Sequence, residues 1–354
     1  MRTIEFRYKI LRNGADYGFL HAAAGNAPVI RMQDDAEIKT AFSGVFAPAA
    51  TDARGREIPV NWQTDELAPV LLLDGVEHKL GVYLPSTVTP SKVDGLETIR
   101  VESYDRGWRV RDDYITKMPY FAAGTNYITA IETLLTACGV SKVSAKPTEA
   151  VLAEDREDWL IGTSTLTIVN QLLDEINYKS LWFDSDGTAI LEPAAVPLAE
   201  NIQHTLDAGK VESLVLPKIS RETDVFAAPN VFLCICSNVD KGAPMVATAE
   251  NVNPQSPLSI PRRGRRIVRV VQVDNIASQA ELQAYADRLR NESMTTGETV
   301  RISTALLPGY GVGDVVALHY GDLNAICIER AWTMELRVGG TMNHTLERVV
   351  YNLG

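Results

Sequence analysis

Side chains that could bind a metal ion are few in this chain and widely spaced. None of its five histidines lies in an HxH or HxxxH pair, spacings that can bring two imidazoles to one metal. Cys234 and Cys236 come closest, because alternation along a strand places both thiols on one face. No second Cys or His pair stands at ligand spacing, so we predict buried free thiols, no bound metal and no cofactor. The histidines are His21, His78, His204, His319 and His344.

Two segments begin like ligand-binding loops but lack parts that such loops need. Asp184-Ser185-Asp186-Gly187 starts like a calcium loop, yet glycine follows the second aspartate directly and no glutamate stands at the EF-hand spacing. Gly309-Tyr310-Gly311-Val312-Gly313 is glycine-rich like a phosphate loop, which needs a helix after it. The next apolar run, Val315–Leu318, is strand-like instead. We therefore predict a hairpin turn for the first segment and a tight connection for the second.

Residue patterns typical of hydrolases are also missing. The sequence contains no Gly-x-Ser-x-Gly elbow. Its acidic clusters, Asp65-Glu66 and Asp155–Asp158, are interpreted as solvated faces, although a carboxylate pair assembled by the fold stays open. We predict that the chain is not an enzyme.

A basic cluster stands out in an otherwise acidic protein. Its members are Arg262, Arg263, Arg265, Arg266 and Arg269. Two interpretations stay open: a solvated loop leading into a strand, or an electrostatic contact with an acidic partner or a neighbouring subunit. The preceding Asn251–Gly264 stretch contains three prolines and is the best candidate for a mobile loop. We predict that the arginine segment contacts a neighbouring subunit or an adjacent protein.

Composition narrows the class of protein. The 354 residues carry a formal net charge of −11, which argues against a nucleic-acid binder. No apolar run approaches the roughly 20 residues that span a bilayer. The chain starts with an alternating segment rather than an apolar leader, so we expect it to fold in a cytoplasm.

The chain divides into three parts by pattern. Residues 1–120 alternate like strands, with glycine turns at 13–14, 74–75 and 105–107, and predict a β-barrel domain. Residues 121–200 carry two apolar stripes at helical spacing and a hairpin, and predict a small α/β module. Residues 201–354 return to strands around a helix at 278–296 and predict a second β-barrel domain. The predicted fold class is mainly β with α+β insertions.

Two segments carry a family resemblance. Ser278-Gln279-Ala280-Glu281 is a capping box that starts an amphipathic helix ending in ADRLRNES. A strand, the segment PGYGVGDVVAL and another strand come after it. This order resembles the C-terminal domain of phage tail hub proteins, the baseplate-hub family of contractile and long non-contractile tails. Asp35–Phe46 is similar to the N-terminal strand region of hub proteins in prophages of Gram-positive bacteria.

The resemblance implies a structural protein of the virion tail tip, assembled in the host bacterial cytoplasm. In that family three subunits, each with two tail-tube-like β-barrel domains, form a ring that joins the tail tube to the spike or tip. The implied partners are the tail tube or distal tail protein and the spike, tip or tape-measure protein. DNA would pass through the ring without sequence-specific binding. Three copies would carry a formal charge of −33, three times −11, which would repel DNA if the charges line the channel.

Two alternatives stay open. One is a monomeric carbohydrate-binding or hydrolytic tail module, which would need exposed aromatic platforms or a carboxylate pair. Most of the five tryptophans stand in strand-like or helix-flanking patterns, which predict that they are buried in the core. They are Trp62, Trp108, Trp159, Trp182 and Trp332. The other is a hexameric distal tail protein, which differs from the hub in forming rings of six copies rather than three.

Overall fold

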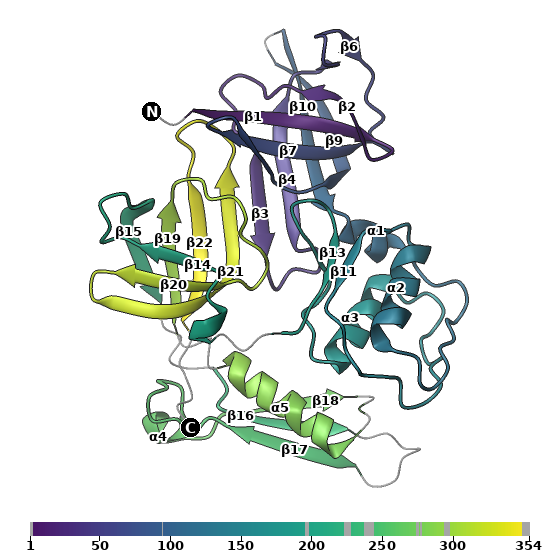
Figure 1. Ribbon diagram of the computed structural model, residues 1–354, viewed down its shortest axis with the longest axis vertical. Coiled ribbons are helices and arrows are strands. Elements are labelled where there is room, and N and C mark those ends of the chain that lie inside the picture. The colour runs from purple at the N-terminus through teal and green to yellow at the C-terminus, as the bar shows by residue number, and fades with distance from the viewer. Residues whose placement is uncertain are drawn as a thin grey trace.

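The computed structural model describes residues 3–93, 95–194, 198–222, 228–236, 244–273, 276, 278–293 and 298–348. A 16-stranded sheet fills the upper part of the molecule, and two three-stranded sheets with the helices lie below and beside it (Figure 1). The prediction of a mainly β chain is confirmed.

Local turn chemistry defines the N-terminal strands. Asn13-Gly14 and Asp74-Gly75 adopt positive φ angles and close the first two predicted hairpins, which are therefore confirmed. The strands are β1 (Ile4–Arg12), β2 (Ala15–Leu20), β3 (Val29–Gln33), β4 (Thr40–Phe46), β5 (Ala50–Thr51), β6 (Glu57–Ile58), β7 (Glu66–Leu73), β8 (Val76–Lys79), β9 (Tyr83–Val93) and β10 (Leu96–Asp105).

The C-terminal strands show the alternation expected of a sheet with one buried face. In the strand at 299–304, Val300, Ile302 and Thr304 are buried and the residues between them are not. The strands are β14 (His204–Asp207), β15 (Val215–Glu222), β19 (Thr299–Thr304), β20 (Val315–Tyr320), β21 (Leu323–Glu335) and β22 (Met342–Arg348). A short 3₁₀ turn, Ala199–Asn201, precedes them.

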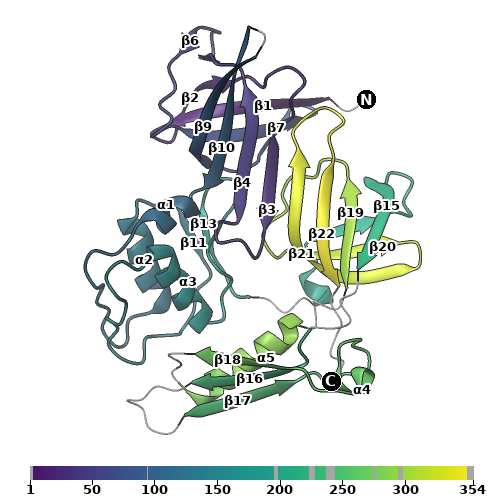
Figure 2. The same cartoon turned by 180° about the vertical axis from the view of Figure 1, so that it is seen from behind.

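One long strand joins the two halves into a single sheet. The first part of β21 pairs with β20, and its last residues, Ala331–Glu335, pair antiparallel with β3. One hydrophobic cluster contains residues of both halves, among them Phe42, Tyr83, Met334 and Met342. The strands of the two ends of the chain lie side by side in both views (Figures 1 and 2).

This pairing corrects the prediction of two closed barrels. The hydrogen-bonded path begins at β15 and ends at β6, and no closed barrel is found among the described residues. Since the second half of β21 pairs with β3, the strands of the C-terminal half extend the sheet of the N-terminal half. Sequence alternation predicts strands and their buried faces, but it does not say which strands pair over such long separations.

The helical module has its own core. Its elements are α1 (Gly107–Asp112), α2 (Tyr127–Ala137), α3 (Thr165–Glu175), β11 (Val143–Ala145), β12 (Trp182–Phe183) and β13 (Ala189–Leu191). Both predicted helical stripes are buried in one cluster, which includes Ile131, Leu135, Val169 and Leu172. The domain boundaries at residues 120 and 200 stay a prediction.

The third predicted hairpin, at residues 105–107, is wrong. The buried Asp105 carboxylate accepts hydrogen bonds from the N–H of Gly107 at 2.8 Å and from the N–H and hydroxyl of Thr40. These contacts turn the chain into α1, whose Val110 is buried in the core of the helical module. The contact with Thr40 joins residues 65 positions apart, so local sequence could not predict it.

The last unit is a small sheet with one helix on it. Its elements are β16 (Val231–Cys236), β17 (Met245–Glu250), β18 (Val268–Val273), α4 (Ile260–Arg263) and α5 (Gln279–Ser293). The Ser278 hydroxyl accepts the N–H of Glu281 at 3.2 Å, which confirms the predicted helix start. The predicted helix end at 296 lies outside the described residues.

Candidate functional site

The arginine cluster lies on α4, on the turn after it and on β18. Ser259 caps α4, its hydroxyl accepting the N–H of Arg262, and Gly264 ends the helix with a φ of +64°. Arg262, Arg265 and Arg266 are exposed, and Arg263 is half-buried. The structure thus brings the first four arginines together.

Arg269 stands apart from the other four. Alternation along β18 places it on the same face as Val271 and Val273, which pack under α5. It lies there in a cavity with Phe232 and Leu289. The predicted set of five therefore divides into four arginines on α4 and the turn after it and one exposed arginine beside α5.

Buried amide side chains hold the loop that carries the arginines. Asn230 donates to the carbonyl oxygens of Leu258 at 3.2 Å and Arg265 at 3.0 Å, and it accepts the N–H of Ile267 at 2.7 Å. Asn251 donates to the Ser256 hydroxyl at 2.9 Å. Leaving such groups unpaired costs about 1–3 kcal/mol each. The segment 251–264 thus contains α4 and folds around its own hydrogen bonds, and its mobility stays a prediction.

The segment keeps a local excess of positive charge. Residues 251–273 contain five arginines and no aspartate or glutamate. Arg262 and Arg263 donate to the carbonyl oxygens of Pro254 and Ala228, at 2.8 and 2.5 Å. Arg266 pairs with Glu250 at 2.6 Å. A carbonyl partner does not neutralise a guanidinium, and the segment itself supplies no acidic side chain.

Beside the arginines the small sheet exposes an apolar face. α5 packs on the side of Cys234, Ala247 and Val271. Figure 1 shows α5 in front of β16–β18, and Figure 2 shows the strands in front of α5. On the opposite side Val246, Val268 and Val270 are 49%, 49% and 56% exposed, next to the half-buried Leu233. We call these four residues the valine face. Sequence patterns do not reveal it, because alternation in β18 does not say which side a helix covers.

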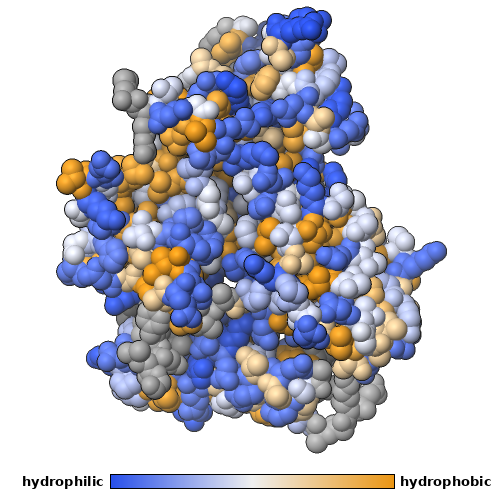
Figure 3. All heavy atoms as spheres, in the orientation of Figure 1, coloured by the Kyte–Doolittle hydropathy of each residue, from blue (hydrophilic) through white to orange (hydrophobic). Residues whose placement is uncertain are grey.

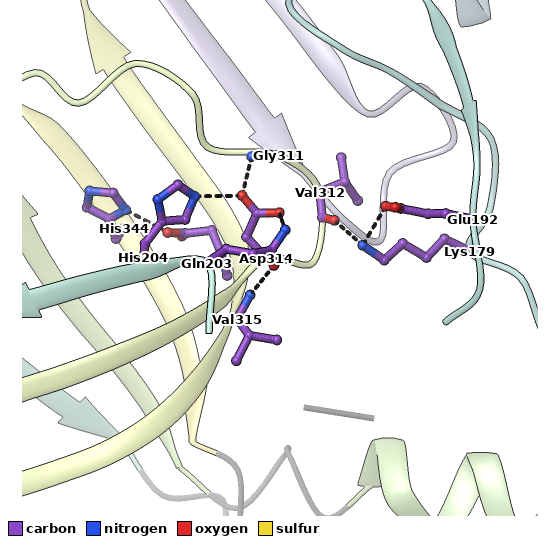
Figure 4. Close-up of polar contacts among 10 residues, drawn as sticks. Lys179, Glu192, Gln203, His204, Gly311, Val312, Asp314, Val315 and His344 are labelled. Atoms are coloured by element: carbon purple, nitrogen blue, oxygen red, sulfur yellow. Dashed lines mark hydrogen bonds and ion pairs between the residues drawn. The ribbon is translucent and has the colours of Figure 1, made fainter. Parts of the chain in front are cut away.

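The glycine-rich segment is a tight connection into strand β20, as predicted. Figure 4 shows Asp314 at its centre, where the carboxylate accepts the N–H of Gly311 at 2.6 Å and binds His204 at 2.9 Å and Gln203 at 3.0 Å. Lys179, from the helical module, donates to the carbonyl oxygen of Val312 at 3.0 Å. The loop thus joins the helical module to the large sheet, and it leads into a strand rather than into a helix that could hold a phosphate.

A fully buried Glu–His pair lies beside this loop. Glu329 Oε2 lies 2.6 Å from His344 Nδ1, and His344 Nε2 lies 3.0 Å from the Thr304 hydroxyl. Tyr310 packs against both imidazoles. Its ring centroid lies 3.8 Å from that of His204, on which it stacks, and 5.0 Å from that of His344. Burial raises the pKa of Glu329, against the opposing effect of the His344 hydrogen bond. Since both side chains are enclosed, the pair contributes to packing between β21 and β22.

Asp65 and Glu66 were predicted to be a solvated face, and this is wrong. Asp65 accepts two hydrogen bonds from the Arg12 guanidinium, at 2.8 and 2.7 Å, and the same contact lowers the pKa of its carboxyl. Glu66 pairs with Arg106 at 2.7 Å. Both carboxylates are buried because arginines from other segments cover them.

The acidic side chains of the second cluster, Asp155–Asp158, are exposed, as predicted, and so is the preceding Glu154. Its arginine, Arg156, is 5% exposed and pairs with Asp158 and Glu175 at 2.8 and 2.9 Å. Asp155 accepts the Tyr120 hydroxyl at 3.0 Å. These contacts fold the segment onto the helical module.

The thiols and the calcium-like turn are structural. All four cysteines are buried, as predicted, and none forms a disulfide; Cys234 and Cys236 pack under α5. Asp184 accepts the N–H groups of Asp186 and Thr188, both at 2.9 Å, in the turn between β12 and β13. Within the described ranges no three His, Cys, Asp or Glu side chains gather as a metal site.

Comparison with solved structures finds phage tail proteins over nearly the whole chain. The tail protein from Neisseria meningitidis matches with a TM-score of 0.66 over 97% of this chain and 96% of its own, at 13% identity. The 43 kDa tail protein of prophage MuSo2 from Shewanella oneidensis matches with a TM-score of 0.67 over 97% of both chains, at 11% identity.

A third match comes from a secretion system. It is an E. coli type VI secretion component, described as similar to the T4 bacteriophage tail proteins gp27 and gp5. It matches with a TM-score of 0.54 over 98% of this chain and 78% of its own, at 11% identity. No family model and no curated protein matches the sequence. The chain therefore has the fold of phage and prophage tail proteins, and the resemblance seen in its sequence is confirmed at the level of fold.

Proposed function

We propose that this chain is the hub protein of a phage or prophage tail. Three copies would close into a ring that joins the tail tube or distal tail protein to the spike or tip, and the ring would form part of the DNA channel. The observation that carries the proposal is the match to tail proteins over nearly the full length of both chains.

The architecture supports a mechanical role. One continuous sheet with a shared core makes the two ends of the chain a single stiff body, as a load-bearing ring subunit requires. The Glu329–His344 pair, the buried cysteines and Asp184 are engaged in internal contacts, which supports a non-enzymatic protein. We propose boundaries near residues 120 and 200 for its N-terminal part, helical module and C-terminal part. Helix α1 and the loop after it precede the first boundary but pack on the core of the module.

The described residues include no helix that is long and apolar enough to cross a membrane. We place the protein at the tail tip of the virion, after assembly in the host bacterial cytoplasm. DNA would only pass through the ring, and an acidic channel would keep it from adhering.

The solution mass of the purified chain tests the ring. Light scattering over a concentration series should give three times 38.8 kDa. Six copies would favour the distal tail protein instead. A monomer that binds bacterial surface polysaccharide would favour the carbohydrate-binding module.

A further inference from the structure

A second exposed apolar surface lies on the helical module. Two of its loops run antiparallel, tied by the N–H of Ile115 to the Thr163 carbonyl at 3.0 Å and by the N–H of Gly162 to the Ile115 carbonyl at 2.9 Å. They expose five large apolar side chains, which we call the module patch. These are Tyr114, Met118, Tyr120, Leu160 and Ile161.

The exposure of this patch is unusual for a surface in water. Leu160 and Ile161 are 77% and 65% exposed, and the other three are more than half exposed. Single exposed apolar residues need no explanation, but a group of five on two tied loops marks a contact surface. Figure 3 shows hydrophobic residues among hydrophilic ones on the visible face of the helical module.

The two apolar surfaces carry opposite charge at their edges. The valine face adjoins the exposed arginines of α4 and the turn after it. The module patch adjoins the acidic segment 154–158, since Tyr120 bonds directly to Asp155. A basic-edged apolar surface and an acidic-edged one are complementary, which favours their association and fixes its orientation.

The two surfaces point in different directions on one chain. The module lies at the right of Figure 1 and α4 at its lower left, and the valine face is turned away from α5. One copy therefore presents both halves of a contact. Joining unlike surfaces of successive copies is the head-to-tail arrangement that closes into a ring.

We propose that the valine face and its arginines dock onto the module patch of the next copy of this chain. The inference rests on the proposed ring and adds which surfaces meet in it. The valines and the loop apolar groups form the dry centre, and Arg262, Arg263, Arg265 and Arg266 face the acidic segment of the neighbour.

Matched substitutions test the apolar centre. Val270→Asp and Leu160→Asp should each weaken trimer formation at least tenfold in a light-scattering dilution series. The controls are Val76→Asp and Val338→Asp, because these valines are 59% and 72% exposed elsewhere on the large sheet and its turns. Each control should assemble like the parent, and all four variants should keep the parent melting temperature within a few degrees.

A charge exchange tests the orientation. Reversing the four arginines to glutamate should abolish the trimer, as should Glu154→Arg with Glu157→Arg. A chain that carries both reversals should regain it, because every contact then has opposite charges again. A merely misfolded variant would not be rescued by the second set of changes.

Cross-linking distinguishes unlike from like surfaces. With a short bis-maleimide, a chain carrying Val270→Cys and Leu160→Cys should give covalent trimers, and neither single variant should cross-link. Dimers of Val270→Cys alone would mean that like faces meet and would overturn the inference.

A trimeric parent whose Val270→Asp and Leu160→Asp variants stay trimeric would also overturn the inference while leaving the ring intact. A parent that remains monomeric at every concentration contradicts the ring and the inference together.

Discussion

At the scale of single residues, the buried Glu329–His344 pair makes stability depend on pH. Burial raises the pKa of Glu329 in the folded state above its unfolded value, so the folded state holds a proton that the unfolded chain loses first. This contribution favours folding at low pH and is lost as pH rises from the unfolded pKa, about 4.3, through the raised folded one.

Glu329→Gln should therefore flatten the decline in melting temperature as pH rises above the unfolded-state pKa of about 4.3, because glutamine keeps a polar partner for His344 without titrating. The measurement is thermal unfolding at several pH values, read as the difference from the parent, since other buried carboxyls also contribute. Glu335→Gln, in an exposed pair with Arg337, is the control and should leave the curve unchanged. Identical slopes for parent and Glu329→Gln would contradict the assignment.

Also at this scale, Asn230 should matter more than any arginine for the stability of the basic segment. Asn230→Ala leaves three backbone groups without their partner and should cost about 2–3 kcal/mol, near the upper end for buried polar groups. Urea unfolding measures this, with Asn343→Ala at an exposed hydrogen bond as control. A cost below about 0.5 kcal/mol, the usual range for surface changes, would show that water replaces the side chain.

The sequence reveals the arginines because they are a cluster of one residue type. It does not reveal Asn230, whose partners lie 28 to 37 positions away. A lone asparagine before a strand is ordinary in sequence, and only the folded chain shows that three backbone groups depend on it.

At the scale of elements, turns were the most predictable part. Asn-Gly and Asp-Gly pairs select the turn by their own backbone preferences, so those hairpins follow from a few residues. Helix α1 was missed because a distant Thr40 holds Asp105. The hydrogen bonds of 251–264 could not be predicted for a similar reason: prolines mark an irregular segment, but they do not tell whether its polar groups find partners.

Gly187, in the turn between β12 and β13, should be more sensitive to substitution than Gly14 in the first hairpin. Its φ is +70°, and an added Cβ would lie 2.9 Å from Val82 Cβ. Gly14 has a similar φ of +77° but open space around it. Gly14→Ala should cost about 1–2 kcal/mol for backbone strain alone, and Gly187→Ala clearly more. Denaturant unfolding of both variants checks this, and equal costs would mean that Val82 moves aside freely.

At the scale of the whole molecule, the pairing of β3 with β21 is the feature that sequence alternation could not predict. Strand patterns at the two ends of the chain suggested two separate barrels, and the pairing of β3 with β21 joins them. These strands lie about 300 residues apart in sequence. Their pairing depends on how both halves fold, and the shared core residues follow from it.

This junction predicts that the two ends of the chain unfold as one unit. Met334 is 2% exposed, pairs with Ile30 across the β21–β3 junction and lies in the shared cluster. Met334→Ala should cost about 2–5 kcal/mol and lower hydrogen-exchange protection in β3 and β4 as well as in β21 and β22. Leu282→Ala, equally buried in α5, is the control and should lower protection mainly in β16–β18. If Met334→Ala leaves β3 and β4 fully protected, the halves fold independently, and the stiff single body proposed for the ring subunit would have to be replaced by two bodies joined at an edge.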